Sequence, residues 1–387
     1  MKNKYIPLSK PFFGKEEKAA VAKAMDSGWV TLGPKTFEFE ESFKKYVAAK
    51  YAVGVSSATA GLHLAMIVAN IKKGDEIIAP TFTFAATINP ALHLGAKPVL
   101  VDIKKDTFNI DTDLIEKKIT KKTRAIVPVH YAGQTVNMDQ VMSLARKYKL
   151  LVIEDAAHAL GSKYKNKSAG SIGDMTVFSF HPIKNITTGD GGMVTTNNKS
   201  FDELMRLYRL HGMNKEAWKR LSKTGNWYYE ITVPGYKYNM TDIAASIGIE
   251  QLKKLKIFNK KRKVLKDLYS KEFKEIPEIT VPFVHKDSEH AWNLYSILLD
   301  IESLKISRND FIEELKKYNI GSSVYFMPLH LHPYYKKILG YKKGDFPNAE
   351  WVYERILSIP LYPAMSTADV LYVARTIKSI IKKYKKN

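Results

Sequence analysis

The residues best suited to covalent chemistry lie in two segments of the chain. Lys184 lies in the segment SFHPIKN (residues 179–185), which the glycine-rich stretch GDGG (residues 189–192) follows, and Asp155 comes shortly after the apolar run LLVI (residues 150–153). A lysine amine can bond covalently to an aldehyde, and a buried carboxylate can keep a heterocyclic nitrogen protonated. Pyridoxal phosphate (PLP) requires both groups, so the sequence predicts a PLP site with Lys184 as its catalytic residue and Asp155 at the ring nitrogen.

A phosphate site is expected where an apolar strand gives way to a helix. Ser57, Ala58, Thr59 and Ala60 stand at this junction, and hydroxyls together with free amides at a helix N-terminus bind anions. Ser179 would add another hydroxyl to the same phosphate. An ordinary Ser/Thr helix cap would use the same residues, and both roles are compatible.

Alternation of strands and helices predicts the elements that position these residues. Short runs rich in Val and Ile indicate strands buried on both faces of a mostly parallel sheet, at residues 52–56, 76–80, 97–102, 124–130, 150–155, 175–180 and 192–196. Helices are expected between them at residues 60–70, 84–94, 113–119 and 138–148. Ligands on such sheets gather at the carboxyl ends of the strands.

The sequence pattern changes after residue 212, and from residue 277 onward it predicts a smaller α+β domain. We expect an aromatic-rich excursion over residues 213–234, a helix over 241–256 and a second long helix reaching residue 273. Further elements follow at residues 291–299, 308–318, 320–325 and 367–383.

Composition narrows the function classes. The 387 residues include no cysteine, which excludes disulfides and thiolate metal ligands, and we expect no metal site. Neither a signal peptide nor a membrane span is recognisable, so the expectation is a cytoplasmic protein without a membrane partner. The net charge of +22 comes from dispersed lysines, which indicates a solvated surface that favours an anionic substrate rather than a nucleic-acid partner.

Motifs in a fixed order over nearly the whole chain resemble those of the DegT-type sugar aminotransferases, a branch of the fold-type I (aspartate aminotransferase) superfamily of PLP enzymes. The motifs are IPL (6–8), GW (28–29), GP (33–34), SATA (57–60), the Lys184 segment and GY (235–236). The resemblance implies an α/β fold with a mostly parallel seven-stranded sheet flanked by helices. It also implies a large PLP-binding domain (residues 1–250) and a smaller α+β C-terminal domain (residues 251–387).

The resemblance also implies roles at the cofactor ring. Phe84 would stack on the ring, His158 would contact the ring hydroxyl, and Lys184 would carry the cofactor. Without the resemblance, the alternatives are a core residue at Phe84, a salt bridge or helix cap at Asp155, and a histidine satisfied by backbone groups at His158.

Other matching positions imply contacts with the substrate and between subunits. Asn239, with Lys237 as second choice, would reach a neighbouring subunit's cofactor phosphate, although the family more often has Asn at the position of Lys237 and Arg at that of Asn239. A cap cluster for the following helix would also explain this segment. Substrate-facing positions would be Trp29, Thr31, His181, Tyr325 and His330, where ordinary packing is the alternative.

The implied activity is transamination of a nucleotide-linked keto sugar with L-glutamate as amino donor, in a homodimer that shares its active sites. Residues 235–242 and 290–292 look closest to enzymes that aminate UDP-linked 4-keto sugars (6-deoxy or pentose), which supply cell-surface glycans. Two alternatives stay open: a PLP-dependent sugar dehydratase and a non-catalytic, basic DNA-binding regulator on the same fold. Lys184 favours transamination, because the related dehydratases have histidine at that position.

Overall fold

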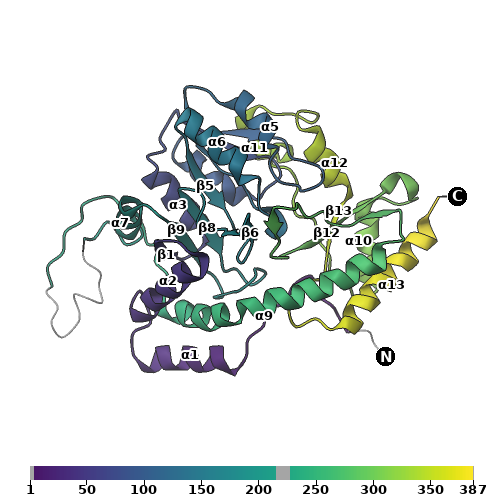
Figure 1. Ribbon diagram of the computed structural model, residues 1–387, viewed down its shortest axis with the longest axis horizontal. Helices are drawn as coiled ribbons and strands as arrows, with labels where there is room; N and C mark the ends of the chain where they lie inside the picture. The colour runs from purple at the N-terminus through teal and green to yellow at the C-terminus, as the bar shows by residue number, and fades with distance from the viewer. Residues whose placement is uncertain (1–3, 215–226, 387) are drawn as a thin grey trace.

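A seven-stranded sheet organises the larger part of the protein, whose computed structural model describes residues 4–214 and 227–386 (Figure 1). The strand order is β1-β9-β8-β5-β4-β2-β3. The strands are β1 (Tyr51–Val55), β2 (Glu76–Pro80), β3 (Lys97–Val101), β4 (Thr123–Ile126), β5 (Leu151–Asp155), β8 (Met175–Ser179) and β9 (Gly192–Thr196). The pairs from β8 to β3 are parallel, whereas β9 runs antiparallel to both its neighbours. The predicted mostly parallel sheet is confirmed, with β4 shorter than expected.

Helices cover both faces of this sheet. Successive strand residues point to opposite sides, so the apolar side chains on each face need a layer of helices to bury them. Val177 packs in one core with α3, whereas the adjacent Phe178 packs in another with α2 and α9. The helices of this part are α1 (Lys15–Asp26), α2 (Pro34–Val47), α3 (Ala58–Val68), α4 (Asn89–His93), α5 (Thr112–Ile115), α6 (Met138–Tyr148) and α7 (Lys199–Tyr208), with short 3₁₀ turns at 85–87 and 116–118.

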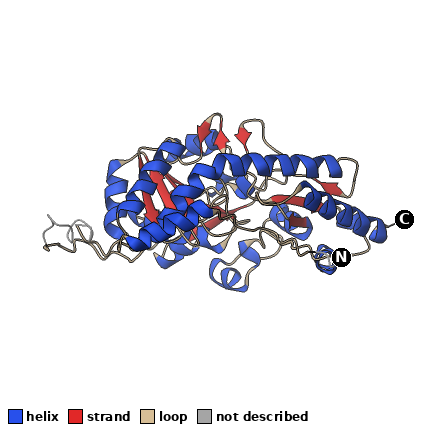
Figure 2. Ribbon diagram, turned by 90° about the horizontal axis from the view of Figure 1, so that it is seen from below, coloured by secondary structure: helices blue, strands red, loops and turns tan. Residues whose placement is uncertain are grey.

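One long helix connects this part to the C-terminal part. Helix α9 (Asp242–Phe273) runs unbroken for 32 residues from the sheet to α13 (Figures 1 and 2). The expected division into two helices near residue 256 is therefore wrong, and the reason is that no proline or glycine interrupts the chain there. The proposed domain boundary after residue 250 falls inside α9 and stays a prediction.

The C-terminal part has its own sheet and core. Its sheet has the order β10-β12-β13, and buried apolar side chains between Leu265 and Ile381 form a separate hydrophobic cluster with Ile6. Its elements are β10 (Ile279–Thr280), β12 (Tyr295–Leu299), α10 (Arg308–Lys317), α11 (Pro333–Leu339), α12 (Pro347–Arg355), β13 (Ile356–Ile359) and α13 (Thr367–Tyr384). Residues 320–325 contribute isolated bridges. A third small sheet joins β11 (Ser288–Glu289), β6 (Lys163–Tyr164) and β7 (Lys167–Ser168).

Candidate active site

A cavity of about 480 Å³ lies where strands β2, β5 and β8 end, and the N-terminus of α3 forms part of its wall. Its volume is in the range of small-molecule sites. The structure brings together in its lining most of the residues that the sequence singled out: Ser57, Ala58, Thr59, Phe84, Asp155, His158, Ser179, His181, Lys184 and Tyr325.

The start of α3 offers hydrogen-bond donors to an anion. Ser57 is the N-cap, and its Oγ accepts a hydrogen bond from the Ala60 amide at 3.1 Å, which leaves the hydroxyl hydrogen free to donate. A Cβ at Gly192 would lie 2.7 Å from the carbonyl carbon of Ser57, so only glycine allows β9 to approach this turn so closely. The cap and the phosphate site use the same residues, while Ala60 itself is buried and does not line the cavity.

Asp155 places a buried carboxylate at the end of β5. Its side chain accepts hydrogen bonds from the Thr87 hydroxyl at 2.8 Å and from the Ala157 amide at 3.1 Å. Within residues 4–214 and 227–386, no ion pair is found for this carboxylate, so the salt-bridge alternative does not explain it. A buried anion without a cation at salt-bridge distance is costly, and a protonated ring nitrogen in the cavity would supply such a close partner.

Lys184 lies on the loop between β8 and β9 with its side chain at the cavity. Burial lowers the pKa of its amine from 10.5 to about 8, and the negative charge of Asp155 opposes this shift only in part. A lysine with a pKa near 8 is neutral in an appreciable fraction of molecules at neutral pH, and the neutral amine is the form that attacks an aldehyde.

His158 is held as a neutral imidazole. Its Nδ1 accepts a hydrogen bond from the Ala132 amide at 3.3 Å, so Nε2 must carry the proton. Burial, followed by the positive charge of Lys184, lowers the pKa of this imidazole well below its usual value. His158 therefore offers a fixed N–H donor, as contact with a ring hydroxyl requires.

Aromatic side chains form another part of the cavity wall. Phe84 is 60% exposed and contacts Phe326 with ring centroids 5.9 Å apart, so Phe84 is not the core residue that the alternative interpretation expected. Phe326 also stacks on His158, with an interplanar angle of 9°. Tyr131 supports this wall by donating a hydrogen bond from its hydroxyl to the Tyr325 carbonyl oxygen.

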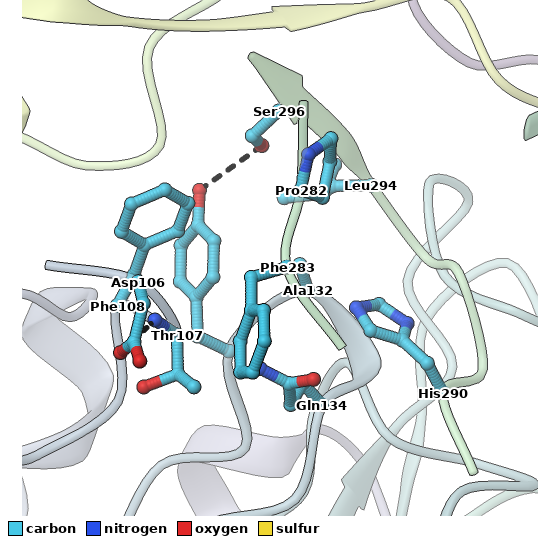
Figure 3. A pocket seen from close by; sticks show the side chains of 11 residues that line it. Asp106, Thr107, Phe108, Ala132, Gln134, Pro282, Phe283, His290, Leu294 and Ser296 are labelled. Carbon is cyan, nitrogen blue, oxygen red and sulfur yellow. Dashed lines mark hydrogen bonds between the residues drawn. The ribbon is translucent and has the colours of Figure 1, made fainter. Parts of the chain in front are cut away.

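Tyr131 also lines a second hollow, together with Phe108, Phe283 and His290 (Figure 3). Its volume is about 10 Å³, which is room for about one water molecule. His290 lines it, but the ring stacks on Trp292 and Nδ1 accepts a hydrogen bond from the Trp292 amide at 2.9 Å. This hollow is too small for a substrate, so its lining residues are packing residues beside the cavity wall.

Other sequence-predicted residues are not brought to the cavity. His330 is fully buried between the Thr81 hydroxyl (2.7 Å) and the Glu350 carboxylate (3.0 Å). This environment fits ordinary packing, the alternative to substrate contact. Trp29 donates from its indole to the Leu32 carbonyl at 3.0 Å, and neither it nor Thr31 lines the cavity.

Asn239 and Lys237 also lie outside the cavity lining. Asn239 pairs with Val55 of β1 through a backbone bridge, and its side-chain amide donates to the Met240 carbonyl at 3.1 Å. Its Oδ1 is buried and has no hydrogen-bond partner among the described residues. Lys237 is exposed, and its backbone pairs with Leu210.

Some residues at the site were missed by the sequence interpretation. Thr87 holds Asp155, Thr83 lines the cavity, and the two hydroxyls are 2.8 Å apart. Their four-residue spacing within TFTFAAT was a usable signal. Phe326 and Tyr131 gave no such signal, because their positions depend on contacts between distant segments.

Together these features fit PLP: donors for a phosphate, a buried carboxylate outside any described salt bridge, and a weakly basic lysine share one cavity. As for membranes, none of the helices within the described ranges combines the length and apolar character needed to span a bilayer.

Comparison with known proteins agrees with this geometry. The model of the DegT/DnrJ/EryC1/StrS aminotransferase family matches residues 11–378. The spore coat polysaccharide biosynthesis protein SpsC of Bacillus subtilis is 46% identical over 98% of each chain. A Streptococcus pneumoniae protein assigned as a sugar aminotransferase, solved in its PLP form, is 35% identical with a TM-score of 0.91 over 98% of this chain and 99% of that chain. PseC of Helicobacter pylori, an aminotransferase involved in pseudoaminic acid biosynthesis, is 32% identical with a TM-score of 0.91 over 98% of this chain and 100% of that chain.

Proposed function

The chain belongs to the DegT/DnrJ/EryC1/StrS aminotransferase family, and from this premise we propose that it aminates the keto carbon of a nucleotide-linked sugar, with L-glutamate as amino donor. It is a PLP-dependent aminotransferase of the sugar aminotransferase class. The observation that carries the proposal is the shared cavity of Lys184 and Asp155, where burial makes the amine weakly basic.

Each residue has a defined task in this proposal. PLP, when bound, draws electrons from the carbon that bears the transferred nitrogen. Lys184 holds the cofactor and, once released, moves a proton between the substrate carbon and the cofactor carbon. Asp155 keeps the ring nitrogen protonated, and His158 donates its Nε2 hydrogen to the ring hydroxyl. Ser57, Thr59 and Ser179 bind the phosphate, and Phe84 stacks on the ring.

A UDP-linked 4-keto sugar is the substrate that we favour. The net charge of +22 favours a doubly phosphorylated, anionic substrate. The names of SpsC and PseC connect related proteins with polysaccharide and acidic-sugar biosynthesis, so we place the amino-sugar product in the synthesis of a cell-surface glycan. His181 and Tyr325 line the cavity and are the residues proposed to contact the sugar.

We also propose that the working enzyme is a homodimer with shared sites. Asp242 ties the segment after Asn239 to the loop that carries Trp29 and Thr31: its carboxylate accepts hydrogen bonds from the amides of Gly33 and Thr36, both at 2.9 Å. These cofactor and substrate candidates thus form one block, outside the cavity of their own chain. A second copy related by two-fold symmetry would bring the block to the partner's cavity.

The exposed excursion after α7 supports this assembly. Trp227 is 79% exposed and Ile231 64% exposed in the stretch that leads from residue 227 to α9. Exposed aromatic and aliphatic side chains of this kind are typical of interfaces. Trp218, which the sequence also placed here, lies outside the described residues.

A subunit-mixing experiment tests the assembly. A Lys184→Ala chain and an Asn239→Ala chain, each inactive alone, are exchanged in equal amounts. Half of the dimers would be mixed, and each mixed dimer would contain one intact site, so activity should return to about a quarter of the wild-type level. No recovery after demonstrated subunit exchange would contradict the cross-subunit role of Asn239.

The activity is tested by loading the protein with the amino form of the cofactor and adding nucleotide-linked keto sugars one at a time. A matching substrate should restore the absorbance of the lysine-bound cofactor. Its product should have lost the keto oxygen and gained one nitrogen and three hydrogens, which mass spectrometry detects. Loss of water from the sugar without gain of nitrogen would indicate the dehydratase instead.

A further inference from the structure

The loop that carries Lys184 is held along its backbone by buried side chains from distant elements. The Asn293 amide donates to the Ile183 carbonyl at 3.1 Å, and the Arg262 guanidinium donates to the Lys184 carbonyl at 3.4 Å and to the Asn185 carbonyl at 3.3 Å. Three consecutive carbonyl oxygens of the loop therefore accept hydrogen bonds from side chains. Arg262 comes from α9 and Asn293 from the segment before β12.

Arg262 is an unusual member of this set, because it is a buried cation whose recorded partners are uncharged. It is 3% exposed, and among the described residues its one other hydrogen bond goes to the Asn259 side-chain oxygen at 3.4 Å. Burial lowers the pKa of its guanidinium from 12.5 to about 9. By contrast, the buried Arg209 is paired with the Glu40 carboxylate. A charge kept in the interior without a carboxylate is costly, so a specific task is needed to explain it.

Asparagine side chains extend the contact on both sides of Arg262. The Asn185 amide donates to Asn259 Oδ1 at 3.0 Å and to the Ala291 carbonyl at 2.9 Å. Asn259 in turn donates to the Leu160 carbonyl at 3.2 Å. The loop, α9 and the chain before β12 are thus connected by one largely buried polar network. We call the Arg262, Asn293, Asn259 and Asn185 side chains the loop bracket.

We propose that Arg262 and Asn293 are positioning residues, which fix the backbone of Lys184 so that its amine stays at the reacting position in the cavity. Positioning matters here because four methylene groups separate the amine from the backbone, and catalytic groups must be held to within about 0.5 Å. Glycines follow the loop closely, and Gly189 has φ +86°, so the loop's own sequence gives it little stiffness. The proposal rests on the assignment of Lys184 as the cofactor lysine.

Arg262→Met tests the proposal, with Arg308→Met as a matched control. Arg308 is also a buried arginine (5% exposed) that donates to a backbone carbonyl, that of Ile356 at 3.0 Å, but it lies on α10 away from the cavity. Three quantities are measured for each variant: the thermal midpoint of the cofactor-free protein, the Kd for PLP, and the visible circular dichroism per bound cofactor. The last reports how rigidly the chromophore is oriented.

Both variants should lower the thermal midpoint, because both lose a buried hydrogen-bonding group. Only Arg262→Met should raise the Kd for PLP, by at least about tenfold (about 1.4 kcal/mol), and reduce the visible circular dichroism. Arg262→Lys should recover part of both, since an ammonium can donate to one carbonyl but lacks the planar fork. If Arg262→Met does not fold, Arg262→Lys and Asn293→Ala are compared with Arg308→Lys on the same quantities.

The proposal is overturned if the Arg262 and Asn293 variants retain wild-type PLP affinity and circular dichroism, or lose them no more than the Arg308 control. Its premise is checked separately by mapping the cofactor in the wild-type protein after borohydride reduction. Attachment to a lysine other than Lys184 removes the premise. Attachment to Lys184 with unaffected Arg262 variants rejects positioning alone.

Discussion

Replacing Asp155 by asparagine removes one negative charge while keeping the local hydrogen bonds. The Asp155 carboxylate accepts from the Thr87 hydroxyl and from the Ala157 amide. Asparagine Oδ1 can still accept from Ala157. Its NH₂ can donate to Thr87, whose hydroxyl can turn toward the Thr83 hydroxyl 2.8 Å away. We therefore expect the variant to fold and to bind PLP with little loss of affinity.

The loss should appear in the rate of the chemical step. Asp155 is 6% exposed, and removing one partner of a buried ion pair costs about 3–5 kcal/mol. Each 1.36 kcal/mol changes a rate tenfold, so the single-turnover rate with L-glutamate should fall by about 10²- to 10⁴-fold. Stopped-flow absorbance of the bound cofactor measures this rate directly.

Thr87→Val is the matched control for the Asp155 variant. It removes a hydrogen bond to the same carboxylate but keeps the charge, so the rate should fall only by the worth of one hydrogen bond to a charged group, about 1.5–3 kcal/mol or roughly 10- to 200-fold. An Asp155→Asn rate within tenfold of wild type, or above that of Thr87→Val, would refute the assigned role of the carboxylate.

Three further predictions concern basicity, packing and surface charge. Because the pKa of Lys184 is lowered from 10.5 to about 8, the unfolded chain binds more protons than the folded one between these values. The cofactor-free protein should therefore gain stability as pH rises from about 8 towards 10.5, a gain that denaturant titrations should show and that Lys184→Met should lack. His330→Ala should lower the unfolding free energy by about 1–3 kcal/mol, because it leaves the Thr81 hydroxyl and the Glu350 carboxylate without this partner. KM for the sugar should stay unchanged; a raised KM at normal stability would restore the substrate-binding interpretation. DNA binding should be weak, independent of sequence and lost steeply with salt; tight, sequence-selective binding at physiological salt in a mobility-shift assay would revive the regulatory alternative.

The sheet and much of the cavity could be predicted from the sequence for a physical reason. Strands buried on both faces are short apolar runs, and the residues after parallel strands meet at one edge. Asp155 and Ser179 end β5 and β8 and line the cavity, as expected. The place of the Lys184 loop followed from its position between the last two strands of the sheet.

Residues that depend on long-range partners could not be predicted. His330 is held by Thr81, 249 positions away in sequence, so its burial leaves no local pattern. Arg262 stands in the run KKRK (residues 260–263), which resembles a solvated basic surface. Only the packing of α9 against the Lys184 loop turns this one side chain inward.

The central claim is that Lys184 carries the cofactor in the cavity that Asp155 lines. Borohydride reduction of the purified, PLP-loaded protein, followed by proteolysis and mass spectrometry, tests it most directly. The modification should lie on the peptide that contains Lys184, and Lys184→Ala should show no modified lysine while its circular dichroism in the far ultraviolet stays that of the wild type. Modification of a different lysine in the wild-type protein, or of the Lys184→Ala variant to the same extent, would contradict the account.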